Sequence, residues 1–173
     1  MKKATAFMFS LLLGVSSVFA QKFCYVDMDY ILGKMPQYKE AQKQLDQTAD
    51  SWQKEVEAKM KKVDDLYKQF QAEQVLLTEQ MKQQKIKDIE AKEKEVKDFQ
   101  KAKFGPNGEL FKKRQELVKP IQDKIYNEIQ KYAQAKSYDI IFDKTSGATM
   151  LYSVQTLNKS DDVLAALGII PSK

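Results

Sequence analysis

The segment 36–136 reads as helix almost throughout, and it constrains the fold more than any other feature of the chain. No glycine or proline falls between Pro36 and Gly105, so nothing there breaks a helix. Two similar strand-like runs enclose the segment, 23–28 before it and 138–143 after it. If these runs pair, the helical segment must leave a small sheet and return to it. The sequence therefore predicts a long helical arm on a small head.

The outgoing half of the arm carries an apolar repeat of seven residues, which is typical of a coiled coil. Such a repeat imposes a left-handed supercoil. Pro36 suits the first turn of the helix, where its missing N–H costs nothing. Two rows form the predicted seam, the first at Tyr38, Leu45, Trp52, Lys59 and Leu66, and the second at Gln42, Ala49, Val56, Val63 and Phe70.

Two segments could form the turn at the tip of the arm. The first is 72–78, where Thr78 fits a helix N-cap. The second is the Gly-Pro-Asn-Gly run at 105–108, whose residue types favour turns more strongly. Turning at 105–108 gives an outgoing helix of about 105 Å and a return of about 42 Å, which falls short of the head. We therefore predict the tip near 72–78. The 105–108 break then becomes a flexible joint that absorbs the longer return, and Pro120 a milder one.

The head is expected to combine 21–35 with 137–173. A third strand at 149–153 follows a turn at Ser146-Gly147, and it forms a natural hairpin with the run 138–143. The predicted fold class is α+β, with a small β-rich head and a long coiled-coil hairpin.

A short final helix, 163–167, is expected near the C-terminus, capped by 160–162 and ended by Gly168. The head is too small to be stable on its own. Oligomerisation through edge strands is the simplest way to stabilise it. The strand residues expected to mediate this association are Phe23, Tyr25, Val26, Ile140, Phe142 and Leu151.

Residues 1–20 have the pattern of a secretory signal peptide. A basic start is followed by the short apolar run 6–18, too short to span a bilayer stably, and Val18-Phe19-Ala20 supplies the small residue for cleavage between Ala20 and Gln21. An uncleaved membrane anchor is the alternative. Cys24 does not fit lipid attachment, because the residues before it are not small and apolar; a buried strand position is expected for it. The mature chain is predicted to be a soluble, exported protein.

The charge balance is modest. The chain has 29 Lys+Arg and 24 Asp+Glu, and loss of the two signal lysines lowers the net charge from +5 to +3. An acidic partner or an anionic membrane surface is compatible with this excess. Nucleic acid is not expected, because the only arginine is Arg114 and no basic cluster is uninterrupted.

Nothing in the sequence indicates an enzyme, a cofactor or a metal site. Histidine is absent, which removes the commonest general base and metal ligand. Asp27 and Asp29 near Asp139 and Asp143 form the strongest carboxylate grouping. Acids at strand ends more often cap turns or pair with lysines, and we prefer that interpretation.

The chain resembles the Skp/OmpH-like periplasmic chaperones. The similarity rests on 25–28, 138–143 and 161–164, and on the order of signal, strand, helical hairpin, strands and short helix along the whole mature chain. The resemblance implies a homotrimer whose heads form a small barrel-like body, with three arms around a cavity. It also implies a function, holding unfolded outer-membrane β-barrel proteins without ATP before they insert. The modest charge and the 105–108 break depart from the better-known members.

Two interpretations of function follow. The first is a periplasmic holdase, for which the expected client-contacting residues are Val75, Leu76 and Leu77 at the tip and Lys59, Lys61, Lys62, Lys82 and Lys85 along the arm. The apolar triplet could instead pack across the turn, or touch a membrane. The second is a structural or adaptor coiled-coil protein of the cell envelope, whose hairpin docks into a partner helix bundle.

Overall fold

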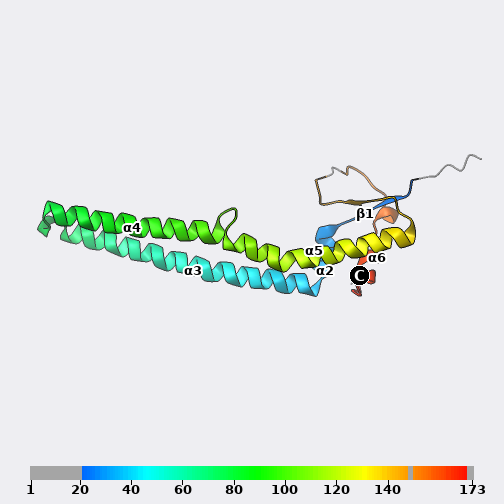
Figure 1. The fold of residues 1–173 in the computed structure, drawn as a ribbon, viewed down its shortest axis with the longest axis horizontal. Helices are drawn as coiled ribbons and strands as arrows, with labels where there is room; N and C mark the ends of the chain where they lie inside the picture. The colour runs from blue at the N-terminus through cyan, green and yellow to red at the C-terminus, as the bar shows by residue number, and fades with distance from the viewer. Residues whose placement is uncertain (1–20, 148–149, 171–173) are drawn as a thin grey trace, which may run out of the picture.

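The computed structural model describes residues 21–147 and 150–170. A two-helix arm projects from a small head, so the molecule is strongly elongated (Figure 1). The predicted signal peptide, including Ala20 of its cleavage site, lies outside the described residues.

The outgoing half of the arm is one unbroken helix, α3 (Pro36–Glu73), and Pro36 occupies its first turn. Leu45 and Val56 of the predicted seam are buried, and all the other seam positions are partly buried. The seven-residue repeat therefore correctly identified the face that α3 turns toward the return helices.

The chain reverses through the short 3-10 turn η1 (Gln74–Leu76), inside the expected range. Thr78 then caps helix α4 (Glu79–Phe104), and its side-chain oxygen accepts a hydrogen bond from the Met81 backbone N–H at 3.3 Å. A threonine at this position satisfies one of the free N–H groups of the new helix.

The return path consists of α4 and α5 (Glu109–Lys136), separated by the loop at 105–108. Together they hold more residues than α3: 26 and 28 against 38. We expected the break to absorb this excess. The additional residues of the return path lie in the head instead. Helix α5 continues beside α2 and α6 (Figure 1), and its residue Ile125 is fully buried there. Helix α5 continues through Pro120.

The two strand-like runs pair as predicted, as a parallel two-stranded sheet of β1 (Phe23–Val26) and β2 (Ile140–Asp143). The third strand was predicted wrongly, since 150–153 form no strand. Instead of folding back on β2, the chain crosses to the other side of β1, where Lys159 N–H donates to the Tyr25 carbonyl at 2.9 Å. The outer edge of β2 is left without a partner strand in the described part of the chain.

Two short helices complete the head. Sequence reasoning extended the first strand to Met28, whereas the structure starts helix α2 (Met28–Lys34) there, with the Asp27 side chain accepting from Tyr30 N–H at 2.9 Å. Helix α6 (Ser160–Ala166) follows the 3-10 turn η2 (Gln155–Leu157) and begins earlier than expected.

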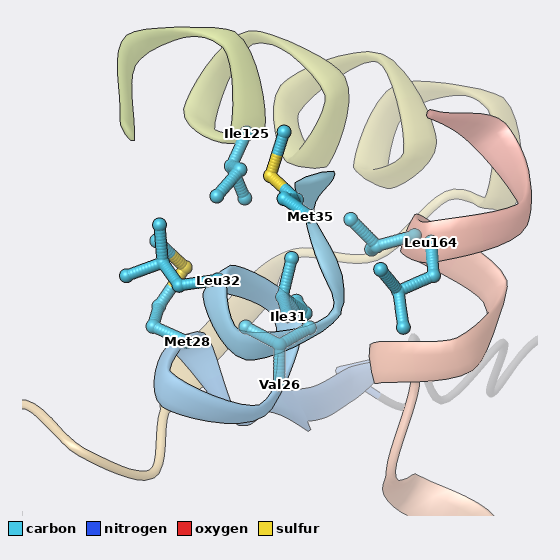
Figure 2. Close-up of a cluster of buried hydrophobic side chains, with 8 residues drawn as sticks. Val26, Met28, Ile31, Leu32, Met35, Ile125 and Leu164 are labelled. Carbon is cyan, nitrogen blue, oxygen red and sulfur yellow. The ribbon is translucent and has the colours of Figure 1, made fainter. Parts of the chain in front are cut away.

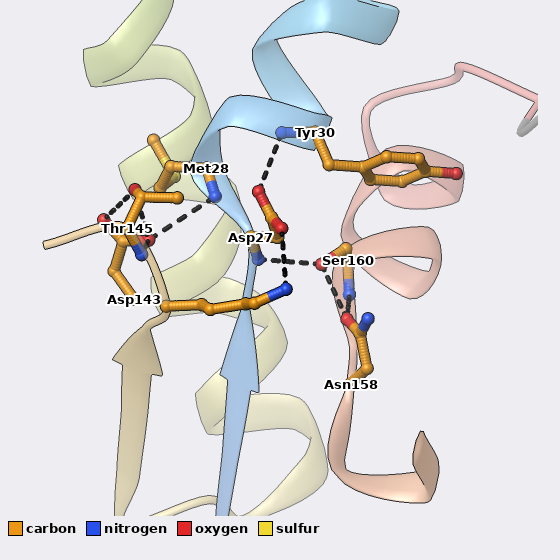
Figure 3. A network of polar contacts seen from close by, with 8 residues as sticks. Asp27, Met28, Tyr30, Asp143, Thr145, Asn158 and Ser160 are labelled. Carbon is orange, nitrogen blue, oxygen red and sulfur yellow. Dashed lines mark hydrogen bonds and ion pairs between the residues drawn. The ribbon is translucent and has the colours of Figure 1, made fainter. Parts of the chain in front are cut away.

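Ser160 is not the cap that the sequence suggested but the first residue of α6. Its hydroxyl is buried, donates to Asn158 Oδ1 at 2.7 Å and accepts from the Asp27 N–H at 2.8 Å. The Ser160 N–H donates to the same Asn158 oxygen at 3.0 Å. Lys159 is the N-cap residue, the Asn158 side chain before it accepts from the first N–H of α6, and Ser160 connects α6 to the start of α2 (Figure 3).

The hydrophobic core lies where β1, α2, α5 and α6 meet (Figure 2). It is small, and one member comes from the arm helix α5, so arm and head share a single core. The buried residues are Val26, Met28, Ile31, Leu32, Met35, Ile125, Val163 and Leu164.

Candidate interaction surfaces

The sheet has an apolar outer face. Strand alternation directs Val26 and Ile141 toward the core, and the register places the neighbouring side chains on the opposite side. Phe23 and Phe142 touch there edge to face, with ring centroids 6.5 Å apart. Phe23 is 49% and Phe142 41% exposed. A sheet that is apolar on both faces is expected to be covered on both. Among the described residues this face is covered only in part, because Tyr25 is buried while the two phenylalanines are not.

A hollow of about 450 Å³ lies against this outer face, bordered by the segment that follows β2. Leu151 and Tyr152, on that segment, are 93% and 84% exposed. The lining residues are Phe23, Cys24, Tyr25, Phe142, Met150, Tyr152, Ser153, Val154 and Leu157.

Four of the six residues expected to mediate association thus lie on one face: Phe23, Tyr25, Ile140 and Phe142. Val26 lies in the core instead, and Leu151 lies outside any strand. Sequence reasoning did not name Tyr152, which it placed in the expected third strand, or Val154, which follows that strand, among the association residues.

Cys24 is buried, as expected for a strand residue, with 1% of its surface exposed. Burial raises the pKa of its thiol above the ordinary value. The side chain therefore stays protonated near neutral pH and behaves as a small apolar group.

The head carboxylates serve as caps, as expected. Asp143 accepts hydrogen bonds from the Thr145 N–H at 2.9 Å and its hydroxyl at 2.8 Å, and Asp27 pairs with Lys144 at 3.5 Å (Figure 3). Asp139 accepts from the backbone N–H of Lys22 at 2.7 Å. Among the described residues, no three acidic, cysteine or histidine side chains are grouped so as to hold a metal ion.

The tip of the arm presents apolar side chains to solvent. Val75 and Leu76 are 85% and 83% exposed, because the three-residue turn that carries them faces no other helix. Leu77, the last of the predicted triplet, is partly buried. One residue of the triplet therefore packs at the turn and two project from it, and contact of these two with a client stays a prediction.

Two of the expected contact lysines are paired within the arm. Lys82 binds Glu79 at 2.8 Å, one turn earlier in α4. Lys85 binds Glu73 at 2.7 Å and so joins α4 to the end of α3. The hydrogen bond from Lys85 lowers the pKa of the Glu73 carboxyl. Only the Lys85–Glu73 pair joins the two helices, and because both pairs are partly exposed they contribute little to stability.

The other three lysines lie further from the tip. Lys59 is partly buried, with its ammonium 5.2 Å from the Phe99 ring centroid, while Lys61 and Lys62 are exposed. Lys59 and Lys62 border a groove of about 510 Å³ between α3 and α4. Its other lining residues are Val63, Asp65, Leu66, Gln69, Lys92, Glu95 and Val96. The groove has a partly apolar floor and charged walls of both signs.

One arm residue was missed altogether. Lys103 lies over the Trp52 ring and pairs with Glu109 across the 105–108 loop. The only hint of this role in the sequence is Phe99, which lies four residues before Lys103 and therefore on the same side of the helix.

Within the described ranges, no helix is both long enough and apolar enough to cross a membrane.

Comparison with known proteins agrees with this architecture. The family model described as outer membrane protein (OmpH-like) matches residues 22–167. The chain belongs to the OmpH-like family. This OmpH-like chain is 30% identical, over 167 residues, to an uncharacterized protein of Aquifex aeolicus (strain VF5), and the match covers 96% of each.

The OmpH-like fold also has a counterpart among solved structures. A crystal structure from Caulobacter crescentus CB15, described as a candidate outer membrane chaperone (OmpH-like), superposes with a TM-score of 0.68. The match covers 89% of this chain and 88% of the other, at 18% identity. The head and the long arm are therefore the common fold, kept with little sequence in common.

Proposed function

We propose that this OmpH-like protein is an ATP-independent periplasmic holdase, which binds unfolded outer-membrane β-barrel proteins and prevents their aggregation before they insert. The observation that carries the proposal is the apolar surface of the distal arm, which no part of the arm covers. Its exposed side chains are Met60, Tyr67, Val75, Leu76, Met81 and Ile86, and we call them the distal apolar surface.

Part of this surface forms a flank of the hairpin. Met60 and Tyr67 are seven residues apart on α3, and Ile86 and Glu93 are seven apart on α4, so each pair shares a helix face. The Tyr67 hydroxyl donates to the Glu93 carboxylate at 3.0 Å, which places the two faces side by side. The flank offers apolar contacts separated by charged positions.

Such a surface suits an unfolded barrel protein. Its strands alternate apolar and polar residues, and their unpaired edges aggregate in water. Scattered apolar contacts bind many such sequences weakly, while the surrounding charges keep the complex soluble. The exposed Lys61 and Lys62 would add attraction for acidic segments or for an anionic membrane surface.

The proposed active form is a homotrimer. The partly exposed outer face of the sheet around Phe23 and Phe142 supports association of the heads, which would set the arms around a common cavity. The function needs no catalytic residue, cofactor, metal or nucleic acid, and the compartment expected for it is the periplasm.

An adaptor that docks into a partner helix bundle is less well supported. It would need a free, dense seam, and the α3 seam residues such as Leu45 and Val56 already pack within the arm. The two functions differ in their partners. Pull-downs with an adaptor should recover one stable protein, whereas a holdase should recover many exported barrel proteins.

The test is an aggregation assay with purified 21–173 and a barrel protein diluted from denaturant, without ATP. We expect light scattering to fall in proportion to the amount of chaperone. Replacing Val75 and Leu76 by serine should weaken the protection several-fold, since it removes the two most exposed apolar contacts of the arm.

The matched control is Ile170→Ser, because Ile170 is 91% exposed but lies in the head. This variant should protect as well as the wild type. Unchanged scattering in the presence of the wild-type protein would refute the holdase proposal.

A further inference from the structure

A cation is enclosed by aromatic rings at the joint between α4 and α5. The Lys103 ammonium lies 4.7 Å from the ring centroid of Trp52 on α3 and 5.5 Å from that of Phe99 on α4. Only 18% of the Lys103 side chain is exposed, although most of the arm lysines lie at the surface. Attraction between an ammonium and aromatic faces is strongest where water is excluded in this way.

The same ammonium crosses the loop to the next helix. It lies 2.5 Å from a carboxylate oxygen of Glu109, the first residue of α5. Lys103 stands in the last turn of α4 and Glu109 in the first turn of α5, so each charge also suits its helix dipole. One side chain therefore ties α3, α4 and α5 together.

A further ring contact closes the arrangement. Phe104, the last residue of α4, meets Trp52 edge to face with centroids 6.2 Å apart. We name this group the Lys103 clasp. It consists of Trp52, Phe99, Lys103, Phe104 and Glu109.

The loop beneath the clasp is compact. A Cβ on Gly108 would lie 2.8 Å from the carbonyl oxygens of Ala102 and Lys103, and one on Gly105 would lie 2.3 Å from the Lys101 carbonyl oxygen. Both glycines are thus required by close backbone approach. The joint is therefore a tight turn, which fixes the end of α4 relative to the start of α5 at the clasp.

Both sides of the clasp contain buried residues, but only the head side is joined to the core of the head. Toward the tip, the buried residues of α3 and α4 are Val56, Ile89 and Val96, and the groove of about 510 Å³ opens between the helices. Toward the head, Ala41 and Leu45 of α3 are also buried, and α5 joins the core of the head through Ile125. No α4 residue belongs to that core, so the distal helices are held together by contacts within the arm alone.

We propose that the Lys103 clasp is a latch, which fastens α4 to α3 at the joint and limits how far the distal helices can separate. Opening beyond the latch would uncover seam residues such as Val63 and Leu66. The ion pair weakens with ionic strength, because 50% of the Glu109 side chain is exposed, whereas the ring contacts are shielded. This inference concerns the arm alone and does not depend on the proposed function.

Trp52 is the only tryptophan in the chain, so its fluorescence reports the clasp directly. Lys103→Met keeps the apolar stem and removes the charge. We expect acrylamide quenching of Trp52 to rise about twofold, with faster amide hydrogen exchange in α4 and unchanged helicity by circular dichroism. Lys97→Met, an exposed lysine of the same helix, is the matched control and should change neither signal.

Glu109→Gln isolates the ion pair, because it leaves the rings and the cation in place. Its quenching should lie between those of the wild type and Lys103→Met, and high salt should bring the wild type to the same level. If Lys103→Met loses helicity, the latch is judged from the quenching and exchange of Glu109→Gln compared with the wild type. Quenching and exchange equal to the Lys97→Met control in both variants would overturn the latch, whatever the aggregation assay shows.

Discussion

Tyr132 shows how single side chains tie the arm to the head. Its hydroxyl donates to the Asp162 carboxylate of α6 at 2.7 Å, and its ring stacks on Tyr138 with centroids 5.9 Å apart. Burial and the hydrogen bond to Asp162 together raise the pKa of the Tyr132 hydroxyl above its ordinary value of 10.0. The folded protein therefore holds this proton more tightly than the unfolded chain does.

The sign of the pH dependence follows from that difference. Tyr132 contributes its full stabilisation below its ordinary pKa and loses it as the pH rises above 10.0. We predict that the free energy of unfolding falls more steeply above that pH in the wild type than in Tyr132→Phe. Urea titrations on both sides of that pH measure this, and parallel declines would contradict it.

At the scale of the element, α5 connects the arm to the head. Its residue Ile125 is fully buried against α2 and α6. Ile125→Ala should lower the free energy of unfolding by about 2–4 kcal/mol, through lost burial and the cavity left behind. Urea unfolding followed by circular dichroism measures the change. Tyr126→Ala, next in sequence but 52% exposed, should cost far less; equal losses would place Ile125 outside the core.

The elements differ in how predictable they were from sequence. Helix α3 and the Thr78 cap were predictable because both depend on residues that are close in sequence. A seven-residue repeat marks one helix face, and a capping hydroxyl binds an N–H three residues later. The third strand was predicted wrongly although its expected partner, β2, is close in sequence. The composition of 149–153 suits a strand, but after β2 the chain continues to the other edge of β1, where Asn158 and Lys159 pair with Tyr25.

The same distinction applies to the interaction surfaces. The tip residues Val75 and Leu76 were identifiable as an apolar run at a turn. Lys103 was not, since one lysine among many becomes distinctive only when Trp52 and Glu109, 51 positions before and 6 after it, are brought beside it.

At the scale of the whole molecule, the outer face of the sheet predicts self-association. We expect 21–173 to have three times the monomer mass by light scattering coupled to size exclusion. Phe142→Asp should dissociate it, because Phe142 is 41% exposed in this chain and a charge there cannot be buried between heads. Tyr126→Asp, on an exposed face of α5, should not. A monomeric wild type would contradict the trimer and favour the adaptor.

The parallel sheet also has a consequence for the order of folding. Lys22 and Asp139, which are 117 positions apart, are hydrogen-bonded beside it. In a disordered chain, closing so long a loop is entropically costly and slow. Each helix of the arm forms from hydrogen bonds that are local in sequence, and the stiff helices carry the two ends of the head back to one place. The arm is therefore the template on which β1 finds β2, and a head can close only where the return helices reach back beyond the start of α3.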